Sequence, residues 1–213
     1  MKKLLFTLAL LISFTGFSQT PITDANFYQA ISTCLSTNQI DGMCSDSEYG
    51  AMPDWDVSQV TEMNNAFVLK SSFNADISAW DVSNVTNMDR MFVGADSFNQ
   101  DLNAWDVSNV TNMAAMFGGA QDFNQNLSAW DVGSVTDMFA MFENATIFNG
   151  DISSWDMSSV TKTTQMFFLA PAFNQPIGDW DVSNVTNMQS MFQKATSFNQ
   201  PIGDWDVSNV INM

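Results

Sequence analysis

Regularly spaced aspartates are the first residues of this chain that could do chemistry. One aspartate follows each tryptophan, at Asp56, Asp81, Asp106, Asp131, Asp156, Asp181 and Asp206. A second column holds Asp76, Asp101 and Asp151 but is interrupted by Asn126, Pro176 and Pro201. Such carboxylates could bind Ca²⁺ between repeats, because hard cations take several oxygen ligands. The broken second column favours Asx turns and solubility instead, and Ca²⁺ binding is kept as the alternative.

The composition removes most catalytic chemistries. The 213 residues include 23 acidic and 6 basic side chains and no histidine, which gives a net charge of −17. Without histidine there is no Ser-His-Asp triad, no imidazole base and no histidine metal site. So few cations argue against nucleic-acid binding. Carboxylate pairs of the glycosidase kind can be drawn anywhere among so many aspartates, so they carry no weight. We expect a protein that is not an enzyme and has no cofactor.

Seven tryptophans recur at one constant interval, at Trp55, Trp80, Trp105, Trp130, Trp155, Trp180 and Trp205. If exposed, the row would offer a platform for sugar rings. The alternative is packing, because a buried tryptophan contributes about 3–5 kcal/mol to stability. Since every repeat carries the same residue, packing is favoured. Ligand recognition is better placed at positions that vary, for example Asp89 and Arg90 against Ala114 and Ala115 or Gln189 and Ser190.

Each repeat combines two apolar patterns. Val85, Met88, Phe92 and Ala95 step by three, four and three residues, which predicts a short helix capped by Ser83 or Asn84. Residues 77–80 predict a short strand. A coil of this kind cannot bury its apolar side alone, so we expect about seven stacked coils over residues 53–213. An asparagine also recurs, at Asn74, Asn99, Asn124, Asn149, Asn174 and Asn199. These side chains suit a ladder in which each one satisfies the backbone groups of a turn.

The N-terminal region differs from the repeats. Lys2 and Lys3 precede an apolar run over residues 4–14, which predicts a signal peptide of residues 1–18 and a secreted or bacterial cell-surface protein. No second stretch has the length of a membrane span. Residues 19–52 are expected to cap the stack.

Within this cap, residues 24–35 predict a helix with Thr23 or Asp24 as its N-terminal cap. Phe27, Ile31 and Leu35 share one face of that helix. Cys34 and Cys44 are the only cysteines of an exported chain, so we expect a disulfide. The sequence stops inside a repeat at its last residue, so we expect a truncated chain.

The repeat unit, seen at residues 77–99 as IxxWDVSNVTNMxxMFxxAxxFN, resembles the BspA-like leucine-rich repeats of bacterial surface proteins. It is also similar to a domain of unknown function in mycoplasma lipoproteins. The resemblance covers residues 53–213, and the departures from it are Ala66, Gly133, Ser134, Met157 and Thr163. It implies an α/β, leucine-rich-repeat-like solenoid of strand-turn-short-helix coils behind an N-terminal helical cap. It also implies secretion or surface display and a role in adhesion, without catalysis.

Three functions therefore compete. The leading expectation is protein–protein interaction or adhesion, with an extracellular protein or cell-surface ligand as partner. The alternatives are a carbohydrate-binding module that uses the aromatic repeat positions, with a glycan as ligand, and a structural spacer for a missing C-terminal domain. Exposure of the tryptophan column separates the first two, because a stacking platform requires exposed rings.

Overall fold

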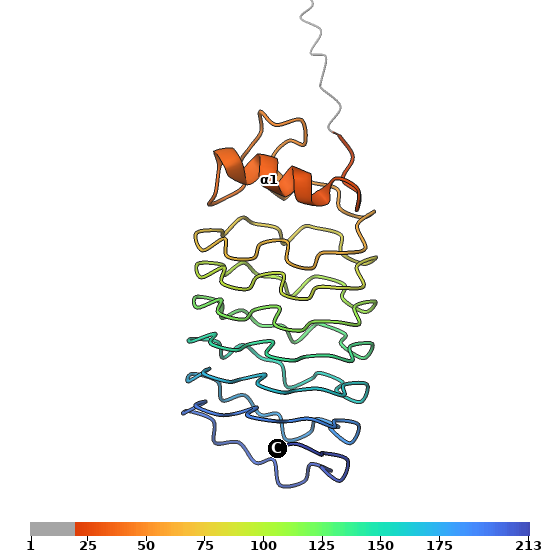
Figure 1. Ribbon diagram of the computed structural model, residues 1–213, viewed down its shortest axis with the longest axis vertical. Coiled ribbons are helices and arrows are strands. Elements are labelled where there is room, and N and C mark those ends of the chain that lie inside the picture. The colour runs from red at the N-terminus through yellow and green to blue at the C-terminus, as the bar shows by residue number, and fades with distance from the viewer. Residues whose placement is uncertain (1–19) are drawn as a thin grey trace, which may run out of the picture.

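The structure is a computed structural model that describes residues 20–213, so the predicted signal peptide lies outside the described residues. The chain forms an elongated stack of coils, with the N-terminal segment lying across one end (Figure 1). The helices of the described residues are α1, Phe27–Thr37, and the 3-10 helix η1, Met52–Asp54.

Successive coils are joined by hydrogen bonds between equivalent parts of adjacent repeats. Isolated parallel bridges connect Glu62 to Asn87, Asn87 to Asn112, and so on to Asn187 and Asn212. Beside them, the Thr86 N–H donates to the Thr61 carbonyl at 2.9 Å, and the same bond recurs one coil later from Thr111. Each coil is therefore held in register by its neighbours.

The expected α/β solenoid of strands and short helices is wrong. Residues 77–80 form a turn, in which the Trp80 N–H donates to the Ile77 carbonyl at 3.1 Å. Residues 85–95 are also turns, and the described coils contain single bridges but no sheet. Ser83 and Asn84 cap no helix. Ser83 donates to Asp81, and the Asn84 amide donates to the Ser58 carbonyl of the preceding coil at 2.9 Å.

The hydrogen bonds explain why the helical pattern gives no helix. In an α-helix every N–H bonds to the carbonyl four residues earlier. Here the donors alternate: the Met91 N–H bonds within its coil to Met88 at 3.2 Å, whereas the Phe92 N–H bonds to Met116 of the next coil at 2.8 Å. Arg90 and Gly94 also have positive φ angles of 55° and 64°. Two left-handed residues four positions apart in one coil interrupt a right-handed helix.

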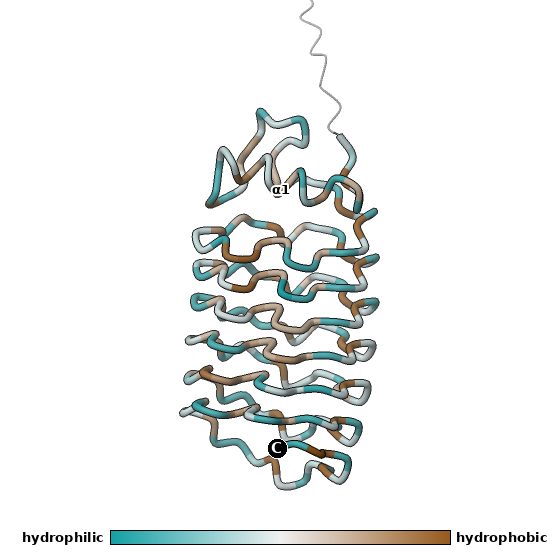
Figure 2. The backbone as a smooth tube through the Cα atoms, in the orientation of Figure 1, coloured by the Kyte–Doolittle hydropathy of each residue, from teal (hydrophilic) through white to brown (hydrophobic). Residues whose placement is uncertain are grey.

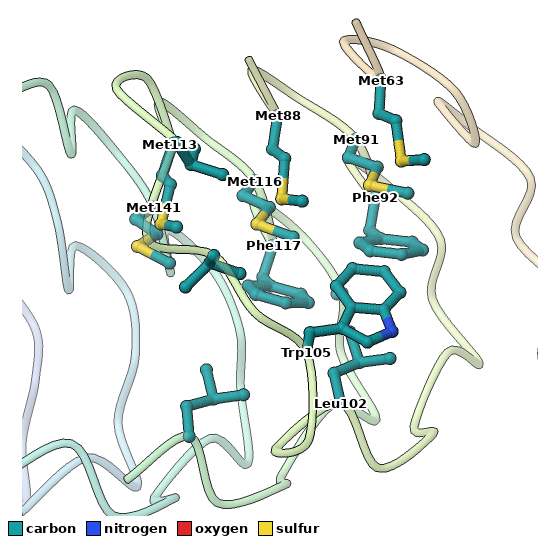
Figure 3. Close-up of a cluster of buried hydrophobic side chains, with 14 of the residues drawn as sticks. Met63, Met88, Met91, Phe92, Leu102, Trp105, Met113, Met116, Phe117 and Met141 are labelled. Carbon is teal, nitrogen blue, oxygen red and sulfur yellow. The ribbon is translucent and has the colours of Figure 1, made fainter. Parts of the chain in front are cut away.

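The core consists of side-chain columns that run through the stack. Phe92 stacks on Phe98 of its own repeat, with 4.0 Å between ring centroids, and on Phe117 of the next coil at 5.5 Å. Methionines of successive coils pack in rows beside these rings (Figure 3). Hydrophobic and hydrophilic segments recur at matching places along the coils (Figure 2). Burial of identical side chains thus stabilises every interface between coils in the same way.

The N-terminal segment supplies the contacts that a preceding coil would otherwise make. The Thr61 N–H, whose counterparts bond to a threonine carbonyl, here donates to the Asp24 carboxylate at 2.8 Å. The Asn74 N–H likewise donates to the Ile40 carbonyl at 2.7 Å. Phe27 of α1 packs edge-on against Trp80, with 5.9 Å between ring centroids.

The helix of this segment differs at its start from the sequence prediction. It begins at Phe27, and its N-cap residue is Asn26, which makes no side-chain capping bond. Asp24 does not cap it because its carboxylate is bound to Thr61. Phe27, Ile31 and Leu35 are all buried. Cys34 and Cys44 form a disulfide, which confirms the predicted pairing.

Replacing Asp24 should destabilise the cap. We expect Asp24→Ala to lower the free energy of unfolding by about 1 kcal/mol, because water can replace the carboxylate only in part. Chemical denaturation measures the effect. Asp46→Ala is the matched control, since Asp46 is exposed and its side chain makes no hydrogen bond within residues 20–213. Equal stability of the two variants would contradict the role assigned to Asp24.

Thr163 stands where other repeats carry methionine, and removing its hydroxyl group should stabilise the protein. It is fully buried, at 0% exposure, and its Oγ1 has no hydrogen-bond partner. We expect Thr163→Val to raise the free energy of unfolding by about 1–2 kcal/mol, because the unsatisfied hydroxyl is removed at constant shape. The control is Thr161→Val, at an exposed threonine whose hydroxyl donates to the Thr136 carbonyl at 3.1 Å. A Thr163→Val variant no more stable than the natural protein would show that the hydroxyl is satisfied.

Candidate functional site

The tryptophan column lies in the core. Trp55 is 4% exposed, and Trp80 to Trp180 are each 3% exposed, while Trp205 in the last coil is half-buried. Each indole N–H is satisfied by a carbonyl, as where Trp105 donates to Ile77 of the preceding coil at 3.1 Å. Neighbouring rings stack on each other, with 6.3 Å between the centroids of Trp130 and Trp155. A row of rings with its faces covered cannot stack against sugars, so this column packs the core.

The aspartates after the tryptophans close Asx turns. The Asp106 carboxylate accepts the Ser108 N–H at 3.1 Å and the Ser108 hydroxyl at 2.7 Å. Hydrogen bonds of this kind, from the side chain and backbone of the serine two residues later, lower the pKa of five of these carboxyls: Asp56, Asp106, Asp156, Asp181 and Asp206. At Asp181 they outweigh burial and the repulsion from Asp156 and Asp206. Asp131 makes the same turn with the Gly133 N–H at 3.0 Å.

No three potential metal-ligating side chains come together anywhere in residues 20–213. The aspartates that follow the tryptophans are all exposed, and their Asx turns already engage them with serine or glycine donors. Stacking of the coils therefore does not bring these aspartates together into a set of ligands that could bind Ca²⁺.

The asparagine column forms a ladder between coils. The Asn99 N–H donates to the side-chain oxygen of Asn74 at 3.0 Å, and the same bond continues to Asn199. The amide of Gln100 donates to the same Asn74 oxygen at 2.9 Å. Each asparagine thus satisfies the backbone of the following coil rather than a turn of its own coil. These side chains are structural.

Sequence variation gathers on one surface, which we call the variable face and define as the exposed side chains nine to seventeen residues after each tryptophan. Large apolar groups are exposed there: Leu69 by 74%, Phe139 by 38% and Ile147 by 46%. Elsewhere in the coils, the exposed positions one and six residues after tryptophan hold aspartate and threonine in nearly every repeat, although the exposed column of Asp76, Asn126 and Pro176 also varies. Exposed apolar groups clustered on one face are typical of protein–protein contact surfaces.

A hollow interrupts the variable face where one coil lacks side chains. At the thirteenth and fourteenth positions after tryptophan, the coil of Trp105 has Gly118 and Gly119, whereas the next coil has Glu143 and Asn144. The resulting hollow is open to solvent and has a volume of about 460 Å³. Gly119 has a φ of 70°, which favours glycine there.

The wall of the hollow carries charge and one aromatic ring. It is formed in part by Arg90, Asp96, Phe139 and Glu143. Asp96 and Glu143 are half-buried, and burial raises the pKa of the Glu143 carboxyl. Arg90 is exposed and lies 4.0 Å from Asp89. No serine, threonine, cysteine or lysine is among the residues that line the hollow.

Sequence reasoning located this site only in part. Of the varying positions singled out above, Arg90 and Ala115 line the hollow, whereas Gln189 and Ser190 lie in a later coil. Gly118, Gly119 and Phe139 were missed. Two consecutive glycines at positions that are otherwise filled were the available signal.

The serine hydroxyl should account for much of the lowered pKa in an Asx turn. In Ser108→Ala we expect the pKa of Asp106 to rise toward about 3.9, the value of a free aspartate. Carbon NMR titration measures it, with Asp156 in the same sample as the internal control. Because the folded pKa is depressed, the stability it contributes is present above pH ~3.9 and is lost as the pH falls through the lower folded value. An unchanged Asp106 pKa would contradict this assignment.

Comparisons place the chain among known proteins. Among residues 20–213, none of the helices is long and apolar enough to cross a membrane. Searches of curated proteins and of solved structures find no match. A family model described as "Mycoplasma protein of unknown function, DUF285" matches residues 38–150 and 124–213, which together span most of the chain. The chain belongs to this family.

Proposed function

We propose that this protein is secreted or displayed on a bacterial cell surface and binds another extracellular protein in adhesion, without catalysis. The observation that carries the proposal is the division of the repeat. Positions that recur in every coil are buried, bonded between coils or, for the aspartate after tryptophan, engaged in an Asx turn, whereas the variable face carries exposed residues that differ from coil to coil. A surface whose residues differ from coil to coil can read a specific partner, and a uniform one cannot.

Three further observations support the proposal. Leu69, Phe139 and Ile147 expose apolar area on that face. The predicted signal peptide directs the chain out of the cell. The repeat resembles those of BspA-like surface proteins, whose studied members act in adhesion. Burial of the tryptophan rings speaks against the carbohydrate-binding alternative in the form that uses this column.

The proposal is tested by binding of the purified mature protein to a panel of immobilised extracellular-matrix proteins and polysaccharides. We expect at least one protein to bind, and Phe139→Ser to weaken that binding by about tenfold or more, because exposed aromatic groups dominate interface energies. The matched control is Ile211→Thr. Ile211 is 81% exposed at a position where the other coils carry threonine, so the change restores the repeat.

Two results would overturn the proposal. One is binding to polysaccharides alone with a shift of the tryptophan fluorescence. The other is protein binding that Phe139→Ser leaves unchanged and Ile211→Thr reduces, because contact would then lie away from the variable face.

A further inference from the structure

The hollow at Gly118 and Gly119 arises because two positions that carry side chains in the next coil hold glycine here. A Cβ atom on Gly118 would lie 3.3 Å from the Ala115 carbonyl oxygen and 3.6 Å from a Val93 methyl group. At Gly119 the φ is 70°, and the equivalent residues Leu69, Asn144 and Lys194 also have positive φ angles, so the hollow arises from the missing side chain and not from the backbone. Because the floor is backbone, a group that enters from outside meets no flexible side chain there. The volume of the hollow, about 460 Å³, exceeds that of any single side chain.

Two carboxylates of the hollow have no partner in the described part of the chain. Asp96 and Glu143 both line it and are half-buried, and neither side chain forms a hydrogen bond or ion pair within residues 20–213. Burial raises the pKa of the Glu143 carboxyl, because its charged form is less hydrated there than in water. A cation beside these carboxylates would compensate for the hydration that they lost on burial. The one cation at the rim, Arg90, is 4.0 Å from the half-buried Asp89.

The remaining contacts suit a long side chain that carries a positive charge. Phe139 lines the hollow and is 38% exposed, and an aromatic ring attracts a guanidinium or ammonium group. Leu69 lies beside the hollow, because a Cβ on the lining residue Gly94 would be 2.8 Å from its Cδ2. Apolar surface of this kind packs against the methylene stem of arginine or lysine.

The charge of the whole chain acts in the same direction. The sequence has 23 acidic and 6 basic side chains, and two of the basic ones, Lys2 and Lys3, precede the described residues. Such a field speeds encounter with a cationic partner and opposes an anionic one. It attracts every cation alike, so recognition must come from the hollow itself.

We propose that the hollow receives an arginine or lysine side chain from a basic segment of the protein partner. The charge of that side chain faces Asp96 and Glu143, its stem lies against Phe139, and the neighbouring residues of the segment contact Leu69. The inference rests on the proposed function and names the chemistry of the partner at that surface.

The test uses the mature protein and two fluorescein-labelled peptides, acetyl-Gly-Ser-Arg-Gly-Arg-Ser-Gly and its counterpart with citrulline for arginine. Fluorescence anisotropy in about 150 mM salt, where long-range attraction is screened, measures binding. We expect the arginine peptide to bind and the citrulline peptide to bind much more weakly. Glu143→Gln and Asp96→Asn should each weaken the arginine peptide about fivefold, as for a partly exposed ion pair.

The matched control is Asp179→Asn, which removes the same charge. Asp179 is exposed in another coil, does not line the hollow, and its side chain makes no hydrogen bond within residues 20–213. If Asp179→Asn weakens binding as much as Glu143→Gln, attraction is by total charge and the inference is wrong. Equal binding of both peptides, or no binding of either, also overturns it.

Failure of this inference can be told from failure of the proposed function. If a matrix protein binds and Phe139→Ser abolishes that binding while Glu143→Gln and Asp96→Asn do not, the variable face is the contact surface but the hollow takes no cation. If no matrix protein binds, the proposed function fails whatever the peptides do.

Discussion

Hydrogen bonding between coils at a fixed step of one repeat is the constraint on which the rest of this structure depends. A coil of turns has no interior of its own and becomes stable only when its backbone donors and apolar side chains meet those of its neighbours. Since each coil must fit the next, a side chain at an inner position lies directly between the equivalent side chains of the two neighbouring coils. The Phe92 and Phe117 rings, 5.5 Å apart, illustrate this match.

This constraint leaves sequence variation only where side chains leave the stack. Thr163 shows what happens when an inner position changes, because its hydroxyl is buried without a partner. On the variable face, by contrast, Leu69, Gly119 and Lys194 occupy equivalent positions without disturbing the coil. Information for recognition can therefore accumulate on one surface while the interior stays uniform, and the hollow is one such departure on that surface.

Sequence reasoning predicted the features that depend on period and residue type. The packing of the tryptophan column, the pairing of Cys34 with Cys44 and a helix near residues 24–35 were all accessible in this way. The strand and the short helix were wrong, because Met88 and Phe92 fit a helical stripe equally well when turns place them inward. The N–H groups of these two residues bond to carbonyls of the next coil, and no local pattern contains partners so distant. Predicting the hollow would have required knowing which positions of each coil face outward.

The Asp24 carboxylate that accepts the Thr61 N–H has a consequence for association between molecules. Rows of unpaired backbone donors at the rim of stacked, β-bridged chains are templates on which further chains can add, and they promote fibre growth. At this end the donors of Thr61 and Asn74 are already occupied by Asp24 and Ile40, and α1 covers the rings beneath them. The N-terminal segment thus opposes the addition of a further chain at this end of the stack.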